Sequence, residues 1–373
     1  MKILHINSYY SISKFYKNLY ELQVLNNKEI TVYIPVEKRF SGSFNFGKYA
    51  VVCKTYNRIE RFFFHLKHNK IVKDVTIRFM SCDFDLIHAH SLFSNGYVAM
   101  KLKEKYNIPY IVAVRNTDVN IFFKKMIHLR KLGINIISNA DRIVFLSPSY
   151  RNQVIETYVP DNIKKSVYDK SVIITNGIDS YWIENKGMPK SINNTQVLKL
   201  IFVGSIDKNK NVLSVIEACE LLIREGFELS LSIIGKVQEK KIFQVINSKE
   251  FANYYSYMQK EDLIQHYRQC DIFVMPSKYE TFGLVYAEAM SQGLPLIYTK
   301  GQGFDGHFED GTVGYAVDAN DIVDIASKIR KIVANYNELS SNSIKNVELF
   351  KWENQEENCS LLYNETLRSN HEY

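Results

Sequence analysis

Short apolar runs alternate along the chain with longer segments that are apolar on one face only. We expect buried strands at the following runs: residues 2–7, 30–35, 86–89, 110–114, 142–146, 172–175, 199–203, 228–234, 272–275 and 295–298. Helical periodicity lies between them, as where Val212, Ile216, Cys219 and Ile223 mark one face of a helix that Gly226 ends. Strand and helix in alternation predict parallel α/β domains.

A polar segment divides this alternating pattern into two parts. Residues 184–196 contain Gly187, Pro189 and several Asn and Ser residues, a composition typical of a linker. A chain of 373 residues can bury two cores. We therefore expect one domain over residues 1–183 and another over residues 184–351.

The stretch from Pro276 to Ile297 carries the clearest chemical pattern. A strand ends there, and a helix is expected to begin near residues 281–283 with a hydroxyl cap and to end at Gly293. Backbone amides at a helix start, beside a glycine, form an anion site. Glu280 precedes the helix and Glu288 lies within it. Phosphate at the helix start and carboxylates on either side fit a sugar nucleotide.

Two glutamates at this spacing also occur by chance, as a loop charge and a solvated helix residue. The apolar neighbours of Glu288 favour instead a carboxylate near a packed face. The segment, with its E-x7-E spacing, resembles the donor-binding signature of retaining GT-B glycosyltransferases of family 4. The resemblance runs through most of the chain and is strongest over about residues 198–319.

This resemblance implies a fold and a separate role for each of the two domains. It implies an α/β protein of the GT-B type, with two Rossmann-like parallel-sheet domains facing a cleft. The first domain would mainly take the acceptor and the second the nucleotide. The last helix, at about residues 352–373, would pack back onto the first domain.

The motif residues receive roles from the same resemblance. Glu288 would hold the ribose hydroxyls and Glu280, a catalytic candidate, the hydroxyls of the donor sugar. The other substrate-binding candidates in this segment are Thr281, Phe282, Gly283 and Leu284, the last three through their backbone amides. No nucleophile is assigned, because retention in this family is described as same-face attack assisted by the leaving group.

A second donor-side pattern is the loop from Phe202 to Asn211. Gly204 lets the backbone turn beside a ligand, and Lys208 and Lys210 follow it. A lysine there can neutralise a diphosphate leaving group, so Lys210 is a catalytic candidate. The family usually has Arg where Ser205 stands, which removes half of the expected diphosphate clamp, and Lys208 could compensate only as a point charge. The alternative is that both lysines are solvated loop residues.

Polar residues also follow the buried run 110–114. The family often has a His in this loop, near the transferring sugar, whereas this chain has Arg115, Asn116 and Asp118. We take Arg115 and Asp118 as catalytic candidates and Asn116 as a substrate contact. A structural ion pair between Arg115 and Asp118 that closes a turn is the equal alternative.

A metal site is weakly indicated. His88 and His90 can share one face of a strand, as metal ligands do, but no third ligand is evident. We expect these histidines to be structural, and we expect neither a metal nor a cofactor in the chemistry, since the nucleotide-sugar is itself a substrate.

Charge and cysteine usage narrow the choice of partners and compartment. The chain has 47 Lys and Arg against 40 Asp and Glu, a net charge of +7, but no signature of nucleic-acid recognition. Five scattered cysteines fit a reducing, cytoplasmic compartment, and no apolar run approaches the roughly 20 residues that span a bilayer. We expect a cytoplasmic protein without a nucleic-acid partner.

Two stretches interleave basic and aromatic residues, at residues 58–70 and 122–131. Either could hold the protein against anionic lipid, on the inner face of the cell membrane. The alternative for each is an ordinary amphipathic helix with its phenylalanines in the core.

The resulting hypothesis is a retaining glycosyltransferase. It would move a sugar from a nucleoside-diphosphate sugar, with UDP as the expected nucleotide, to a glycan or lipid-linked oligosaccharide in surface polysaccharide synthesis. Two alternatives remain from other classes: a non-catalytic GT-B subunit of a glycosyltransferase complex, and a nucleotide-sugar epimerase.

Overall fold

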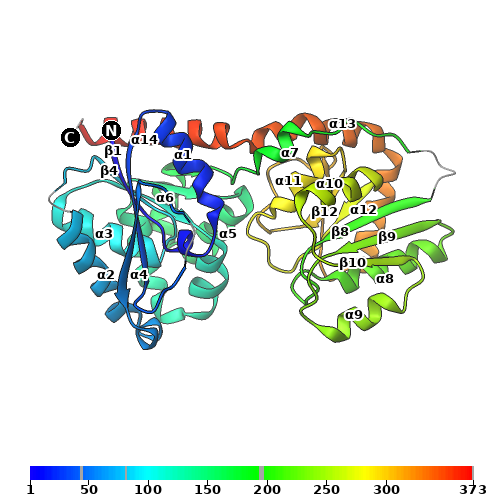
Figure 1. The fold of residues 1–373 in the computed structure, drawn as a ribbon, viewed down its shortest axis with the longest axis horizontal. Coiled ribbons are helices and arrows are strands. Elements are labelled where there is room, and N and C mark those ends of the chain that lie inside the picture. Colours follow the sequence, from blue (N-terminus) through cyan, green and yellow to red (C-terminus); the bar gives the residue numbers. More distant parts are fainter. Residues whose placement is uncertain (43–44, 80–81, 193–196, 372–373) are drawn as a thin grey trace. The chain divides into compact units, whose positions relative to one another are not determined.

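The computed structural model describes residues 1–42, 45–79, 82–192 and 197–371 and contains two compact units (Figure 1). The first unit comprises residues 1–146, 150–175 and the chain from residue 352 onward, and the second comprises residues 147–149 and 176–351. The boundary between the units therefore falls after residue 175, earlier than the expected residue 183.

The earlier boundary has a packing cause. Helix α7 (Ser180–Glu184) belongs to the second unit because its Trp182, which is 2% exposed, lies in the core of that unit. The expected linker, residues 184–196, follows α7, and its last four residues, 193–196, lie outside the described residues.

The first unit is built on a seven-stranded parallel sheet in the order β3-β2-β1-β4-β5-β6-β7. Its strands are β1 (Lys2–Ile6), β2 (Glu29–Glu37), β3 (Ala50–Tyr56), β4 (Leu86–Ala89), β5 (Tyr110–Val114), β6 (Arg142–Phe145) and β7 (Ser171–Ile173). Side chains that alternate along each strand enter two separate cores. In β5, Val112 lies in one core and Ile111 in the other, so both faces of the sheet are covered.

Helices supply the covering layers of this sheet. They are α1 (Lys17–Leu25), α2 (Phe64–Phe79), α3 (Ser94–Tyr106), α4 (Arg130–Asn139), α5 (Pro148–Tyr158), α6 (Asp161–Asp169) and α14 (Trp352–His371), with short 3-10 helices η1 (Ser8–Ser11), η2 (Lys14–Tyr16), η3 (Arg58–Phe62) and η5 (Ile127–Leu129) and a π-helix η4 (Asp118–Phe123). Residues of α2, α3 and α4 line one core, whereas residues of α1 and α14 line the other.

The second unit has a six-stranded parallel sheet in the order β10-β9-β8-β11-β12-β13. Its strands are β8 (Leu198–Val203), β9 (Leu229–Ile234), β10 (Ala252–Tyr255), β11 (Ile272–Val274), β12 (Leu296–Thr299) and β13 (Gly314–Val317). Besides α7, its helices are α8 (Val212–Arg224), α9 (Lys240–Asn247), α10 (Lys260–Gln269), α11 (Leu284–Ser291), α12 (Ile322–Ala334), α13 (Tyr336–Asn346) and the 3-10 helix η6 (Val347–Phe350). One continuous core joins them.

The expected strands are present, and three further strands were not expected. These are β3, β10 and β13, and each is an edge strand of its sheet. β10 alternates between half-buried and exposed residues along its length, and β3 buries only two of its seven residues. An edge strand has one neighbour and more solvent, which fits the partial burial of β3 and β10.

Helix α14 packs against α1 in the first unit (Figure 1). The Tyr363 hydroxyl lies 2.7 Å from Nδ1 of His88, and the side-chain amide of Gln23 donates to the same hydroxyl at 3.1 Å. Glu356, 3% exposed, accepts from the Lys28 ammonium and from the Asn26 amide, each at 2.5 Å. Burial opposes ionisation of Glu356, but its bonds to Lys28 and Ser360 outweigh burial and lower the pKa of the carboxyl.

Removing this charge should loosen the helix. We expect Glu356→Gln to weaken the docking of α14 by about 1–3 kcal/mol, because the Lys28 ammonium would stay buried without its counter-ion. Hydrogen exchange of α14 amides measures the effect, and Glu357→Gln, at an exposed site on the same helix, is the matched control. Because the carboxyl pKa is lowered on folding, this stabilisation should also be lost as the pH falls through that pKa. Equal exchange in both variants would contradict the assignment.

Candidate functional site

The loops that follow β8 and β11 bring two of the candidate residues together. The Lys210 ammonium lies 2.5 Å from Oε2 of Glu280, although 70 residues separate them in the sequence. Glu280 is only 8% exposed, so it is not a solvated loop charge. The strands β8 and β11 are parallel neighbours, and their carboxyl ends therefore carry these loops to the same edge of the sheet.

Backbone packing fixes the first of these loops. A Cβ atom at Gly235 would lie 1.9 Å from the carbonyl oxygen of Gly204. The backbones just after β8 and β9 therefore approach at a distance that only glycine permits. The Lys210 amide donates to Oδ1 of Asp207 at 2.8 Å, which closes the turn that presents the lysine. A Cβ atom at Gly204 would lie 3.4 Å from Cγ of Lys210, so a larger residue there would press on the lysine.

Asparagine and glutamine side chains hold the second loop against its surroundings. Asn209 donates to the Tyr279 carbonyl at 3.0 Å and accepts from the Tyr279 amide at 3.1 Å. Asn211 donates to the carbonyl oxygens of Pro276 and Ala319, at 3.1 and 2.6 Å. The Glu280 amide donates to the side chain of Gln302 at 3.0 Å.

These three positioning residues were not among the sequence candidates. Asn209, Asn211 and Gln302 act through contacts with residues of other loops, distant in sequence, and a single chain offers no signal for such pairs.

Helix α11 begins later than the sequence suggested. Its cap is Gly283, whose φ is 75°, and no side chain caps the helix, so the expected hydroxyl cap is wrong. A left-handed residue is possible here because glycine has no Cβ. The Thr281 amide donates instead to Oε1 of Glu280 at 3.0 Å, and Phe282 is buried with its ring near those of Phe304 and Phe350.

The start of α11 has the character of an anion site. Amides in the first turn of a helix have no carbonyl partner within the helix, and the helix dipole adds positive potential there. The sequence predicted this feature with Phe282, Gly283 and Leu284 as its residues. Leu284 is half-buried as the first helical residue, and Glu280 lies immediately before the group.

Glu288 lies in the middle of α11 and is half-buried. Burial, and after it the negative charge of Asp179, raise the pKa of its carboxyl to about 7. The phenol of Tyr267 and the ammonium of Lys260 oppose this rise. A carboxyl poised near neutrality, between a buried phenol and an ion pair, has the character of a binding site and not of a solvated helix residue.

The other polar candidates of the first loop, Ser205 and Lys208, contact residues other than Glu280. The Ser205 hydroxyl donates to Oδ2 of Asp207, next to the bond that Asp207 accepts from Lys210. Lys208 is largely exposed and lies 3.8 Å from Glu239. Lys210 is thus the residue of this loop whose charge lies against Glu280.

In the first unit, Asp118 is buried and acts on the backbone. Its carboxylate accepts from the amides of Leu92, Phe93 and Arg115, at 3.0, 3.1 and 2.9 Å. Burial raises the pKa of Asp118 to about 6 against the effect of these three bonds. The carboxylate therefore ties the loop after β4 to the loop after β5.

Its neighbours make local contacts as well. The Arg115 side chain donates to the His90 carbonyl at 3.3 Å and lies over the ring of Tyr16. Asn116 accepts from the side chain of Asn120 at 2.8 Å. The structure brings all three candidates of this loop together in the first unit.

A third histidine joins the pair seen in the sequence. His5 on β1 is the register partner of His88 on β4, and its Nδ1 lies 3.0 Å from Nε2 of His90. Among the described residues these three could hold a metal ion, since one nitrogen of each lies within 4.8 Å of the others. Burial lowers the pKa of all three histidines, so they are neutral. His88 also contacts the Tyr363 hydroxyl, and a structural role for the histidines stays a prediction.

The two basic and aromatic stretches differ in where their apolar side chains point. In residues 58–70, four large apolar residues are exposed: Ile59 at 72%, Phe62 at 85%, Phe63 at 58% and Leu66 at 50%. In residues 122–131, Phe123 and Leu129 are buried, and Phe122 stacks on Phe93 at 4.5 Å. The second stretch therefore places Phe122, Phe123 and Leu129 against the core and leaves Ile127, which is 64% exposed, at the surface. No described helix is long and apolar enough to cross a membrane.

Two family models match the chain. Residues 29–181 match the model described as Glycosyltransferase Family 4, and residues 184–349 match the model described as Glycosyl transferases group 1. The chain belongs to the group 1, family 4 glycosyltransferases. The predicted family and the predicted GT-B class, with two Rossmann-like parallel-sheet units, are thereby confirmed.

Individual proteins agree with this assignment. The chain is 28% identical over 273 residues to an uncharacterised glycosyltransferase of Methanocaldococcus jannaschii, covering 72% of each chain. It is 24% identical over 326 residues to the alpha-monoglucosyldiacylglycerol synthase of Acholeplasma laidlawii, covering 80% of each. The fold of this glycosyltransferase matches that of the Anabaena protein HepE, solved with UDP-glucose, with a TM-score of 0.66, 15% identity and coverage of 99% and 100%.

The raised pKa of Glu288 predicts a pH dependence of stability. Because the folded chain favours the neutral carboxyl, Glu288 stabilises the fold least when the pH rises above about 7, where it must ionise. Glu288→Gln is neutral at every pH. Its free energy of unfolding, relative to that of the glycosyltransferase with Glu288 intact, should therefore rise by about 1–3 kcal/mol between about pH 5 and about pH 8. Urea denaturation at both pH values measures the gain. Glu261→Gln, at an exposed site on α10, should show none, and a gain of the same size there would contradict the assignment.

Proposed function

We propose that this glycosyltransferase transfers a sugar, with retention of configuration, from a UDP-sugar to a glycan or a lipid-linked oligosaccharide. The observation that carries the proposal is the contact between Lys210 and Glu280 beside the start of α11. It places one cation, one carboxylate and the first amides of a helix at the same edge of a parallel sheet. Those groups match a diphosphate, a sugar hydroxyl and phosphate oxygens.

The ion pair suggests how donor binding proceeds. With the site as it stands, Lys210 and Glu280 neutralise each other. A diphosphate would take Lys210 as its counter-ion, and the Glu280 carboxylate would then accept from hydroxyls of the donor sugar. Lys210 and the amides of α11 supply positive charge where the leaving group develops negative charge, so the proposed reaction needs no metal ion.

Glu288 fits the opposite end of the donor. Its carboxylate, once ionised, would accept from the two ribose hydroxyls. UDP is the proposed nucleotide because the structural neighbour from Anabaena binds UDP-glucose, and a hexose is the proposed sugar for the same reason. Retention is supported by the family resemblance alone.

The proposed acceptor is attached to a membrane lipid. The exposed apolar residues around η3 alternate with Arg58, Arg61, Lys67 and Lys70, which is the pattern of an interfacial surface. We define residues Ile59, Phe62, Phe63 and Leu66 as the apolar patch. A relative, the synthase of Acholeplasma laidlawii, is named for a diacylglycerol product. We place this protein in the cytoplasm, peripheral on the inner face of the membrane, in surface polysaccharide synthesis.

Donor binding is tested by thermal stabilisation with UDP, GDP, ADP and their sugars. A ligand at 100 times its dissociation constant stabilises the native state by about 2.7 kcal/mol, so the preferred nucleotide should raise the melting temperature by a few degrees. Glu288→Ala should remove the shift with UDP. Glu280→Gln should keep the shift with UDP, lose the extra shift with the UDP-sugar and lower turnover at least about 100-fold.

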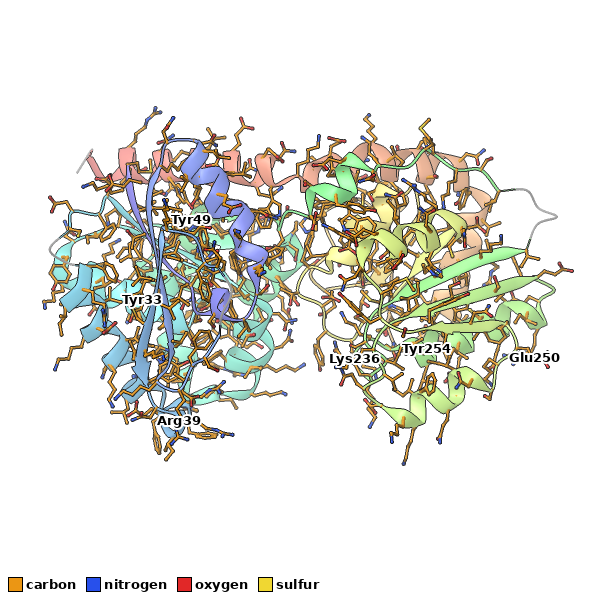
Figure 2. All side chains as sticks on the ribbon, in the orientation of Figure 1. Tyr33, Arg39, Tyr49, Lys236, Glu250 and Tyr254 are labelled. Atoms are coloured by element: carbon orange, nitrogen blue, oxygen red, sulfur yellow. The ribbon has the colours of Figure 1, made fainter. Side chains whose placement is uncertain are left out.

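Glu250→Gln is the control for this experiment, because Glu250 lies exposed at the far end of the second unit (Figure 2). Full turnover by Glu280→Gln would contradict the site. The absence of a shift with any nucleotide would favour the non-catalytic subunit, and turnover of the donor without an acceptor would favour the epimerase.

Membrane contact is tested by flotation with vesicles that contain anionic lipid. The double variant Phe62→Ser, Phe63→Ser should reduce bound protein at least about tenfold, because two large apolar side chains would no longer enter the interface. Ile77→Ser is the matched control, since Ile77 is 72% exposed on α2 but lies outside the apolar patch. Equal losses in both variants, or no binding by the unmodified protein at low salt, would rule out this surface.

A further inference from the structure

A pocket of about 390 Å³ lies in the first unit at the carboxyl ends of β2 and β3. Its lining comes from four segments of the chain: Ser11 and Ile12 after β1, Val36 to Gly42 at the end of β2, Tyr56 at the end of β3, and Arg61 of η3. Ligands of open parallel sheets bind at this edge. The residues proposed for donor binding all belong to the second unit, so this pocket is a separate feature.

Two guanidinium groups and one carboxylate give the pocket its charge. Arg39 and Arg61 both line it, and Figure 2 shows Arg39 at the lower tip of the first unit. Glu37 lies 3.9 Å from Arg61, a loose pair whose arginine side chain is 62% exposed. One carboxylate opposite two arginines leaves a net positive charge. The planar fork of arginine suits the oxygens of a phosphate group.

The pocket borders the apolar patch. Arg61 lines the pocket, and Phe62, the next residue of η3, is 85% exposed. Ile12, another lining residue, is 80% exposed. A capping interaction orders this edge, because the Asn57 amide donates to the Glu60 carboxylate at 2.9 Å and Lys70 pairs with the same carboxylate. The pocket thus has two exposed arginines in its lining and large exposed apolar side chains beside it.

We propose that this pocket binds the phosphate or diphosphate that joins the lipid to the sugar of the acceptor. The phosphate would lie between Arg39 and Arg61, and the hydrocarbon part would lie along Ile12 and the apolar patch, in the membrane. The inference rests on the proposed function, because it names the class of acceptor that the glycosyltransferase takes. It commits to a lipid and not to a soluble phosphate, since the exposed apolar rim needs a hydrocarbon partner.

The experiment compares two kinds of phosphatidylcholine vesicle with matched surface charge. One contains a polyprenyl diphosphate whose outer phosphate carries a sugar, and the other contains phosphatidylglycerol, which has a single phosphate. The full chain should bind the diphosphate vesicles about tenfold more strongly. Arg39→Ala and Arg61→Ala should each abolish this preference, because each variant removes one of the two phosphate-binding forks, and should weaken binding to phosphatidylglycerol no more than Arg58→Ala does.

Arg58→Ala is the matched control, because Arg58 is an exposed arginine of the same helix that does not line the pocket. It should weaken binding to both vesicles equally and leave the preference intact. Equal effects of Arg58→Ala and Arg39→Ala on the preference would overturn the proposal. Displacement from diphosphate vesicles by an equal concentration of inorganic pyrophosphate would also overturn it, by showing a site for a soluble phosphate.

The outcome is separable from that of the donor experiment, because these vesicles contain no nucleotide. Stabilisation by a UDP-sugar together with no preference between vesicles would reject the pocket alone. A preference between vesicles together with no stabilisation by any nucleotide would uphold the phosphate site and reject the proposed donor.

Discussion

Parallel pairing places the carboxyl ends of all strands at one edge of each sheet, and the chemistry of this protein depends on that constraint. In the second unit it brings the loop after β8 to the loop after β11, so that Lys210 lies 2.5 Å from Glu280. In the first unit it brings the ends of β2 and β3 together around one pocket. In both units a parallel sheet must be covered on both faces, which leaves the loops as the place for polar groups.

The sequence predicted central strands well because such strands are buried on both faces. β5 and β8 are nearly continuous apolar runs, and their chemistry identifies them without knowledge of their neighbours. The edge strands β3 and β10 are only partly buried and β13 has four residues, so their signal is weaker. The last helix, α14, was expected from the family resemblance. Its contacts with Lys28 and Gln23 were not, because they are side-chain pairs that no local pattern encodes.

The candidate site shows the same division. The motif residues Glu280, Glu288 and Lys210 could be named as candidates from the sequence, because each lies in a short segment whose residue spacing resembles the family motif. The start of α11 was misjudged, since a hydroxyl at Thr281 is an ordinary cap and the left-handed cap at Gly283 is not a property of sequence alone. His5 was missed because its proximity to His88 arises from the pairing of β1 with β4, 83 residues apart.

The replacement of the family arginine by Ser205 changes which groups must neutralise a diphosphate. The Ser205 hydroxyl bonds to Asp207, and Lys208 lies out in solvent near Glu239, so neither takes over the missing charge at Glu280. One lysine is a point charge, so in the proposed site the backbone amides at the start of α11 would supply more of the positive potential. Their direction is set by Gly283, where a Cβ would lie 2.4 Å from the ring of Tyr286. That ring is fixed in turn by its hydroxyl, which donates to the Met275 carbonyl at the end of β11 at 2.6 Å. The end of β11 therefore fixes the direction of these amides through Tyr286.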